Sequence, residues 1–168
     1  MAKVRLLFSN SKLPLSPIIR AVTALQTGAA CEWSHVALVI SDVEFIDNNA
    51  IIIESTLSHG GVNLSTVGDF KKRAKTWCLV ELKQQVKDFD AMVAIAKSKL
   101  GKPYDFTGIL GLGIKRDWQE DDSWFCSEDV SDTLKRSGLN LKGLTNVHSV
   151  FPQTCFNWEH TVLGRSVF

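Results

Sequence analysis

A cysteine at the predicted start of a helix is the residue in this sequence best suited to covalent chemistry. Cys126 follows a polar turn at 121–125 and opens a stretch with acids early and bases late, which extends to Arg136. Backbone N–H groups at a helix start stabilise a thiolate, and the thiolate is the nucleophilic form of cysteine. The alternative is that Cys126, Val130 and Leu134 form an apolar stripe, with the cysteine as a small core residue.

A histidine and a glutamate on two predicted strands are the partners that such a thiolate would need. His35 is the only titratable residue in the otherwise apolar segment 34–40, and Glu54 ends the apolar run 51–53. A buried imidazole needs partners for both ring nitrogens, and a thiol on one side with a carboxylate on the other would satisfy both. In that arrangement the histidine takes the thiol proton and the acid orients the ring. The alternatives are a core histidine bonded to backbone carbonyls and a solvated glutamate at a strand end.

Tyr104 is the only tyrosine and lies in the segment 101–105, which contains a glycine and a proline. Its hydroxyl can donate to an oxyanion that develops beside the nucleophile, or it can anchor the turn. Asp105 and Glu128 compete with Glu54 for the role of orienting the histidine. Since no CxxC or HxxxH pair occurs in the sequence, we expect neither a structural zinc site nor a cofactor.

The elements that position these residues are a series of short strands and three helices. Apolar runs separated by turns predict strands at 3–8, 34–40, 50–54, 62–64 and 76–82. Capping residues and apolar periodicity predict helices at 16–28, 88–100 and 126–136. Several strands in a row indicate an antiparallel sheet rather than βαβ units. Residues 101–122 are interpreted as a long loop, and the tail from 143 gives no clear pattern.

Composition limits the class of protein. The chain has 168 residues, 45% of them hydrophobic and 22% charged, and a net charge of +1. These values are typical of one globular domain, which we expect to span residues 1–168. They argue against a disordered chain and give no bulk field that would attract nucleic acid or an anionic membrane. The basic run 71–75 is interpreted as a solvated helix end, with a nucleic-acid site as the alternative.

Two sequence features that the chain lacks bear on where in the cell the protein resides. No apolar run reaches the ~18 residues of a transmembrane helix, and the N-terminus lacks the ~7–15 apolar residues of a signal peptide. We therefore expect no integral membrane segment and a cytoplasmic protein, with delivery by a phage particle or another system as an alternative. The four cysteines are expected to be free thiols, with Cys78 buried in a strand and Cys31 and Cys155 partly exposed.

Six short motifs occur in a distinctive order along the chain. They are Ile18-Ile-Arg20, Thr27-Gly28, Trp33-Ser-His-Val36, Glu54-Ser55, Gly101-Lys-Pro-Tyr-Asp105 and Phe125-Cys-Ser-Glu128. Their order and spacing resemble the circularly permuted NlpC/P60 proteins of bacteria and phages, which are papain-like thiol hydrolases. The resemblance covers roughly residues 15–155 and is closest to the branch in which the histidine precedes the cysteine. Pro152 also falls where that branch often has a proline.

The resemblance implies a fold, a site and an activity. The fold would be α+β and papain-like, with an antiparallel sheet packed against the helix that carries the cysteine. Cys126 would be the nucleophile, His35 the base and Glu54 the third member, with Tyr104 near the site. The protein would be a thiol hydrolase or acyltransferase that cleaves an amide or ester, acting on a cell-wall peptide or a lipid-like acyl substrate. The alternative is a catalytically silent ligand-binding or phage structural module on the same fold.

Two features depart from the family that the sequence resembles, and two apolar segments exceed what packing of the core needs. A charged loop at 115–122 precedes Cys126, and a second cysteine, Cys155, stands where the resemblance predicts an apolar residue. Two segments carry more apolar residues than one core stripe requires, and we predict that they line an apolar groove leading to Cys126. The alternative is that they complete the core. They consist of Ile18, Ile19, Val22 and Leu25, and of Ile109, Leu110, Leu112 and Ile114.

Overall fold

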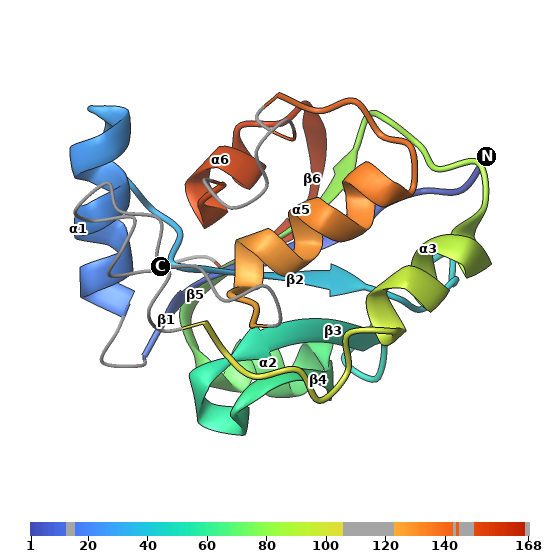
Figure 1. Ribbon diagram of the computed structural model, residues 1–168, viewed down its shortest axis with the longest axis horizontal. Coiled ribbons are helices and arrows are strands. Elements are labelled where there is room, and N and C mark those ends of the chain that lie inside the picture. Colours follow the sequence, from blue (N-terminus) through green and yellow to red (C-terminus); the bar gives the residue numbers. More distant parts are fainter. Residues whose placement is uncertain (13–15, 106–122, 143, 145–149, 167–168) are drawn as a thin grey trace.

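The computed structural model describes residues 1–12, 16–105, 123–142, 144 and 150–166, and Figure 1 shows a sheet with helices on both of its faces. The sheet has six strands in the order β4-β3-β2-β1-β5-β6, and each neighbouring pair is antiparallel. The predicted antiparallel sheet in an α+β fold is therefore confirmed. The strands are β1 (Arg5–Ser11), β2 (His35–Val39), β3 (Ile51–Thr56), β4 (Gly61–Thr66), β5 (Ala74–Leu82) and β6 (His160–Arg165).

The helices begin and end where local capping chemistry permits. The Asp88 carboxylate accepts a hydrogen bond from the Ala91 N–H at 2.9 Å, which satisfies one of the free donors at the start of α3. Gly28 follows α1 with a φ of 68°, a left-handed conformation that glycine adopts without strain. The helices are α1 (Ser16–Thr27), α2 (Val67–Arg73), α3 (Phe89–Lys97), α5 (Cys126–Arg136) and α6 (Pro152–Phe156), with a 3₁₀ turn η1 (Leu57–His59).

The centre of the sheet is apolar on both faces, as the sequence of β2, which is apolar except at His35, predicts. Val36 and Leu38 belong to the larger core, which also contains Cys126 and other residues of α5. Ala37 and Val39 point to the opposite face and pack in a smaller core with Phe70 of α2. Helices α5 and α2 therefore cover opposite faces of the same central strands.

The pairing between β2 and β3 differs from the rest of the sheet. Over these two fully described strands, the ladder consists of Leu38 opposite Ile53 and Val39 opposite Ile52. We call these four residues the paired end. The other ends of the two strands, His35 of β2 and 54–56 of β3, form no ladder with each other, and we call them the unpaired end. Helix α5 packs against both β2 and β3, so it connects the two strands on one face of the sheet.

Helix α6 and strand β6 were not predicted from the sequence, and of α2 only its basic end was. Helix α2 is short and contains Gly68, while α6 has only five residues, so neither gives a strong periodic signal. Strand β6 lies at the sheet edge with mostly exposed or half-buried residues, so it lacks the apolar alternation of a buried strand. The predicted loop 115–122 and the apolar segment 109–114 lie outside the described residues.

The described residues contain no membrane-spanning helix. None of their helices combines the length and the apolarity that crossing a bilayer requires. The single domain over 1–168 and the cytoplasmic location stay predictions.

Candidate active site

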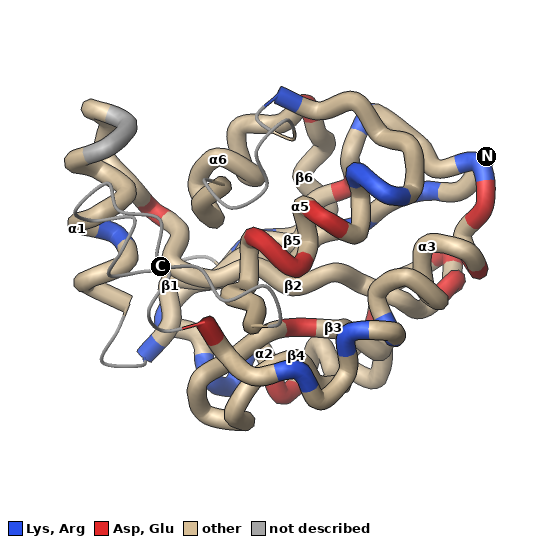
Figure 2. Tube along the Cα trace, in the orientation of Figure 1, with Lys and Arg blue, Asp and Glu red and all other residues tan. Residues whose placement is uncertain are grey.

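Cys126 is the first residue of α5 and is buried, with 2% of its surface exposed. The start of this helix is stabilised by Glu128, whose carboxylate accepts a hydrogen bond from the Phe125 N–H at 3.5 Å. Figure 2 shows acidic residues in the first part of α5 and basic residues at its end, the distribution that the helix dipole favours. The backbone N–H groups of this first turn lie beside the thiol of Cys126.

A buried lysine from beyond α3 holds the middle of α5 in place. The Lys99 ammonium donates to the Asp129 carboxylate at 3.1 Å, to the Asp129 carbonyl at 2.8 Å and to the Thr133 hydroxyl at 2.9 Å. It also lies 2.9 Å from the Asp132 carboxylate and 4.5 Å from the centre of the Trp124 ring. A buried charge requires several such partners, and through them Lys99 anchors the helix that begins with Cys126.

His35 lies between Cys126 and Glu54. Its Nε2 is 2.7 Å from Glu54 Oε2, so Nδ1 is the ring nitrogen left for Cys126, whose side chain is a hydrogen-bond partner of the imidazole. The ring stacks on Phe70 of α2, with centroids 5.4 Å apart and planes 19° from parallel. Burial by itself would lower the pKa of His35, but the negative charge and hydrogen bond of Cys126, followed by those of Glu54, raise it to about 9. A pKa of about 9 favours the imidazolium form of His35 at neutral pH.

Glu54 is ionised in spite of complete burial. Its exposed fraction is 0%, and burial alone would raise its pKa, but the hydrogen bond and charge of His35, and then Arg73, lower that pKa to about 2. The second carboxylate oxygen, Oε1, forms an ion pair with Nη2 of Arg73 at the end of α2. Both oxygens of this carboxylate therefore have a cationic partner.

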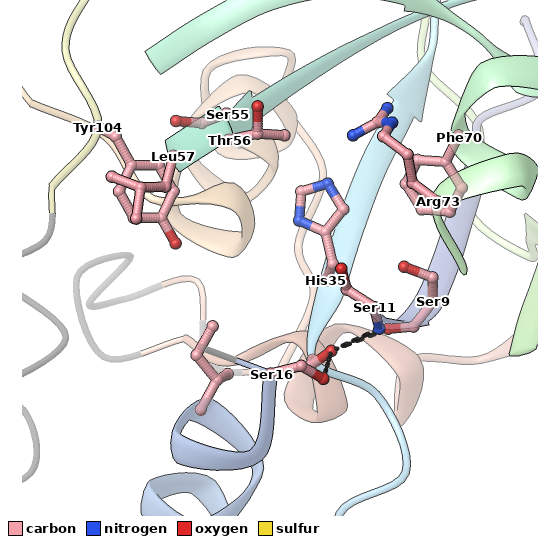
Figure 3. Close-up of a pocket in the computed structure, with 12 residues that line it drawn as sticks. Ser9, Ser11, Ser16, His35, Ser55, Thr56, Leu57, Phe70, Arg73 and Tyr104 are labelled. Carbon is pink, nitrogen blue, oxygen red and sulfur yellow. Dashed lines mark hydrogen bonds between the residues drawn. The ribbon is translucent and has the colours of Figure 1, made fainter. Parts of the chain in front are cut away.

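A small pocket adjoins His35, with an accessible volume of about 30 Å³. In Figure 3, His35 and Tyr104 reach into this pocket from different sides. Burial, then the charges of Cys126 and Asp105, raise the pKa of the Tyr104 hydroxyl, which remains a hydrogen-bond donor over the physiological range. Much of the remaining wall consists of hydroxyl side chains, namely Ser9, Ser11, Ser16, Ser34, Ser55 and Thr56.

The four residues selected from the sequence lie close together, and of the three candidate acids Glu54 is the one that bonds to His35. The carboxylate bonded to His35 is that of Glu54, whereas Glu128 accepts from the backbone of Phe125. Asp105 donates its backbone N–H to Trp124 at 3.3 Å beside Tyr104. The catalytic roles of Cys126, His35, Glu54 and Tyr104 stay predictions, and this geometry is what motivates them.

Arg73 is the residue that the sequence interpretation missed. It was assigned to a solvated basic run, and Lys72 of that run is indeed exposed, with 79% of its side chain accessible. Arg73 instead turns inward to Glu54. Two signals could have identified it: a glutamate on a fully apolar strand requires a cation, and Thr66 followed by Asp69 is typical of a helix start. The Thr66 hydroxyl does accept a hydrogen bond from the Asp69 N–H, at 3.1 Å.

The predicted apolar groove has only partial support among the described residues. Ile19 lines the pocket, but Ile18 and Leu25 of the same helix are 46% and 86% exposed. The second predicted wall, Ile109, Leu110, Leu112 and Ile114, lies outside the described residues. The expectation that Cys31 and Cys155 are partly exposed is wrong, since both are buried, Cys155 within α6.

The order of the chain and the architecture define a class of protein. A sheet strand that carries a histidine precedes a helix that begins with a cysteine, and the two side chains meet beside a buried carboxylate. This is the arrangement of the permuted papain-like enzymes.

A family model agrees with that class. The Peptidase_C92 family, described as the permuted papain-like amidase enzymes YaeF/YiiX, matches residues 4–166. The chain belongs to the Peptidase_C92 family, and the prediction of a cysteine hydrolase is confirmed. The resemblance to NlpC/P60 proteins therefore holds at the level of the permuted papain-like class.

A solved structure has the same fold. The chain is similar to a crystal structure described as the metalloprotein yiiX from Escherichia coli O157:H7, with a TM-score of 0.70 and 18% identity over 98% of this chain and 97% of that one. A search of curated proteins found no match. Within the described ranges, no three His, Cys, Asp or Glu side chains gather as metal ligands, so those residues do not fit a metal site.

Proposed function

We propose that the protein hydrolyses an amide bond, with Cys126 as nucleophile, His35 as general acid and base, and Glu54 as the group that orients His35. The observation that carries this proposal is the position of the His35 imidazole, which lies 2.7 Å from Glu54 on one side and close enough to Cys126 for the charge and hydrogen bonding of that thiol to raise the His35 pKa. A thiol and a carboxylate on opposite sides of one imidazole form the arrangement in which cysteine nucleophiles are activated.

The reaction proceeds in two halves. The Cys126 thiolate attacks the carbonyl carbon, and the tetrahedral intermediate collapses when the His35 imidazolium gives its proton to the leaving nitrogen. The C–N bond breaks, the amine departs and a thioester remains on Cys126. Water then attacks the thioester while neutral His35 takes its proton, and the acid product leaves as the thiolate re-forms. An acceptor other than water would give acyl transfer from the same thioester.

Two donors would stabilise the oxyanion. The backbone N–H of Cys126 lies at the start of α5, where it has no partner within the helix. The Tyr104 hydroxyl reaches into the adjoining pocket, as Figure 3 shows, and its raised pKa keeps the donating proton in place. Donors fixed at the point where negative charge develops are usually a large part of catalysis.

The pocket chemistry favours a polar, peptide-like substrate. Hydroxyl groups can both donate and accept, so they suit the N–H and C=O groups of a peptide better than the methylene groups of an acyl chain. The Ser16 hydroxyl lies 2.7 Å from that of Ser34 and 3.0 Å from the Asn10 amide oxygen, which shows how such groups bond in this wall. A lipid-like acyl group is the second candidate, supported by the apolar side chains of Ile19 and Leu57 in the same pocket.

The experiment is labelling with a panel of acyl probes that trap thiol hydrolases as stable adducts, half with peptide-like and half with fatty acyl groups. We expect wild type to be labelled by the peptide-like probes at Cys126, and Cys126→Ala and His35→Ala to remain unlabelled. Cys31→Ala is the matched control, because it removes a buried thiol away from His35. Labelling that survives Cys126→Ala would refute the proposal, and a folded protein that no probe modifies would favour the silent binding module.

A further inference from the structure

We infer that Arg73 is a positioning residue of this site, which holds Glu54 in the orientation that serves His35. This inference rests on the proposed function, because it assigns Arg73 a task only if His35 takes part in turnover. It concerns a residue from α2, on the face of the sheet opposite to the helix of Cys126.

The two oxygens of the Glu54 carboxylate have different partners. Oε2 lies 2.7 Å from His35 Nε2, and Oε1 forms an ion pair with Arg73 Nη2. A carboxylate bonded to a single partner can rotate about its last torsion, which is broad for glutamate. One that is held at both oxygens presents a fixed lone pair to the imidazole. Arg73 thereby restricts the orientation of the His35 ring through Glu54.

Arg73 is itself held in place. Its Nε donates to the Asp69 carbonyl at 3.2 Å, one turn earlier in α2, and its Nη2 lies 3.4 Å from the Ser65 hydroxyl. Its guanidinium carbon is 5.9 Å from the centre of the Phe70 ring, and that ring stacks on His35. Helix α2 therefore supplies both supports of the His35–Glu54 pair: Phe70 against the face of the ring and Arg73 against the acid.

The charge of Arg73 matters at the step in which His35 becomes neutral. Glu54 is completely buried, and a buried carboxylate without a cation tends to take up a proton. When His35 gives its proton to the leaving group, one of the two cations beside Glu54 is lost. Arg73 keeps its charge at every pH of interest, so Glu54 remains an anion throughout the cycle. It can then stabilise the imidazolium when His35 is protonated again.

The test compares Arg73→Met and Arg73→Lys with Lys72→Met. Lys72 is the matched control, since it lies in the same turn of α2 and is exposed. We expect Arg73→Met to lower kcat by about 10–100-fold, the loss typical when a partner that orients an active-site ligand is removed, with KM within about twofold. We expect Arg73→Lys to recover part of kcat, because it retains the charge without the planar fork, and Lys72→Met to match wild type.

The pH profile separates positioning from a purely structural role. In wild type the carboxylate is ionised down to a pKa of about 2. Without the Arg73 charge, that pKa should rise toward or above the ordinary glutamate value of about 4.3, so the acid limb of kcat/KM should move to higher pH in Arg73→Met. If Arg73 only anchors α2, Arg73→Met should lower the melting temperature and leave the acid limb of kcat/KM unchanged. That result, or an unaltered kcat, would overturn the inference; if Arg73→Met does not fold, an unaltered kcat and acid limb in Arg73→Gln would overturn it.

A double-mutant cycle provides a further readout. If Arg73 acts through Glu54, Arg73→Met should have little further effect on kcat in a Glu54→Gln background. Additive losses would mean that Arg73 acts elsewhere. The two proposals fail in different ways: turnover that survives Cys126→Ala refutes the proposed function, whereas an inactive Cys126→Ala beside a fully active Arg73→Met refutes only the role of Arg73.

Discussion

The two ends of the β2–β3 pair differ in chemistry as well as in hydrogen bonding. At the paired end, Leu38, Val39, Ile52 and Ile53 are apolar, almost fully buried and joined in a regular ladder. At the unpaired end, the strands carry His35, Glu54, Ser55 and Thr56, and the Ser55 hydroxyl donates to the Trp124 carbonyl just before α5. One end of the same two strands builds the core, and the other builds the candidate site.

The two ends differ because the groups of the candidate site come from opposite faces of the sheet. His35 and Glu54 lie on the α2 face, since they alternate with Val36 and Ile53 of the α5 face. Cys126 belongs to the helix on the other face. A continuous ladder between β2 and β3 would place backbone between the thiol and the imidazole. The unpaired end therefore allows groups from both faces of the sheet to meet, and the paired end maintains the strand alignment that this requires.

The largest expected effect is at the unpaired end. Cys126→Ser should abolish measurable turnover, because a serine hydroxyl is a far weaker nucleophile than a thiolate beside the same imidazole. The free energy of unfolding should change by only about 1 kcal/mol, since one buried atom is exchanged for another. Steady-state kinetics and urea unfolding of the purified variant measure the two quantities. Full activity in Cys126→Ser would make Cys126 a packing residue.

Glu54→Gln should have the next largest effect. The amide keeps the shape of the side chain but removes the charge that holds the His35 imidazolium, so kcat should fall by about 10²–10⁴-fold, the range of positioned proton transfer. Glu54 also helps to raise the pKa of His35 to about 9. The alkaline limb of kcat/KM, expected near that value in wild type, should therefore move to lower pH in the variant. An unshifted limb would contradict the assignment of Glu54.

A substitution at the paired end should reduce stability and leave activity nearly unchanged. Leu38→Ala removes a fully buried side chain from the larger core and should cost about 2–5 kcal/mol of unfolding free energy. Because Leu38 lies at the paired end and carries no group that can bond to His35 or Glu54, kcat per folded molecule should stay within about twofold of wild type. Denaturant titration combined with active-site counting by a thiol probe tests this. A large loss of kcat in the folded fraction would show that the two ends are not independent.

The same contrast explains how far the sequence alone could predict the molecule. The strands of the paired end and the helix of Cys126 were predicted because their apolar periodicity and caps are local signals. The contact of His35 with Glu54 was inferred from the need of a buried imidazole for a carboxylate, and Glu54 is the acid that the structure places there. Arg73 was missed because α2 is short, and because a basic residue in a charged run has no local sign that it turns inward.

For the predicted apolar groove, the sequence interpretation assigned a function to residues that the structure does not place in the site. Apolar residues in excess of one stripe predicted a wall along α1, but Ile18 and Leu25 face away from the core, and only Ile19 lines the pocket. Helical periodicity indicates which residues share a face and not what covers that face. The serine side chains of the pocket come from β1, α1, β3 and the residue just before β2, so their convergence depends on the strand order rather than on any local motif.

The smallest expected effect is the dependence of stability on pH, which separates the two ends without any substrate. The pKa of Glu54 is lowered from 4.5 to about 2, so its contribution to stability is present above pH 4.5 and is lost as the pH falls toward 2. The pKa of His35 is raised from 6.5 to about 9, so its contribution is complete below pH 6.5 and is lost as the pH rises through 9. Wild type should therefore be most stable between these flanks, and Glu54→Gln should flatten the acid flank and weaken the alkaline one. Leu38→Ala should lower the whole curve and leave its shape unchanged, because that side chain does not titrate. Thermal unfolding across pH 3–10 measures all three curves, and equal stability of wild type at pH 6.5 and pH 9 would show that folding does not raise the His35 pKa.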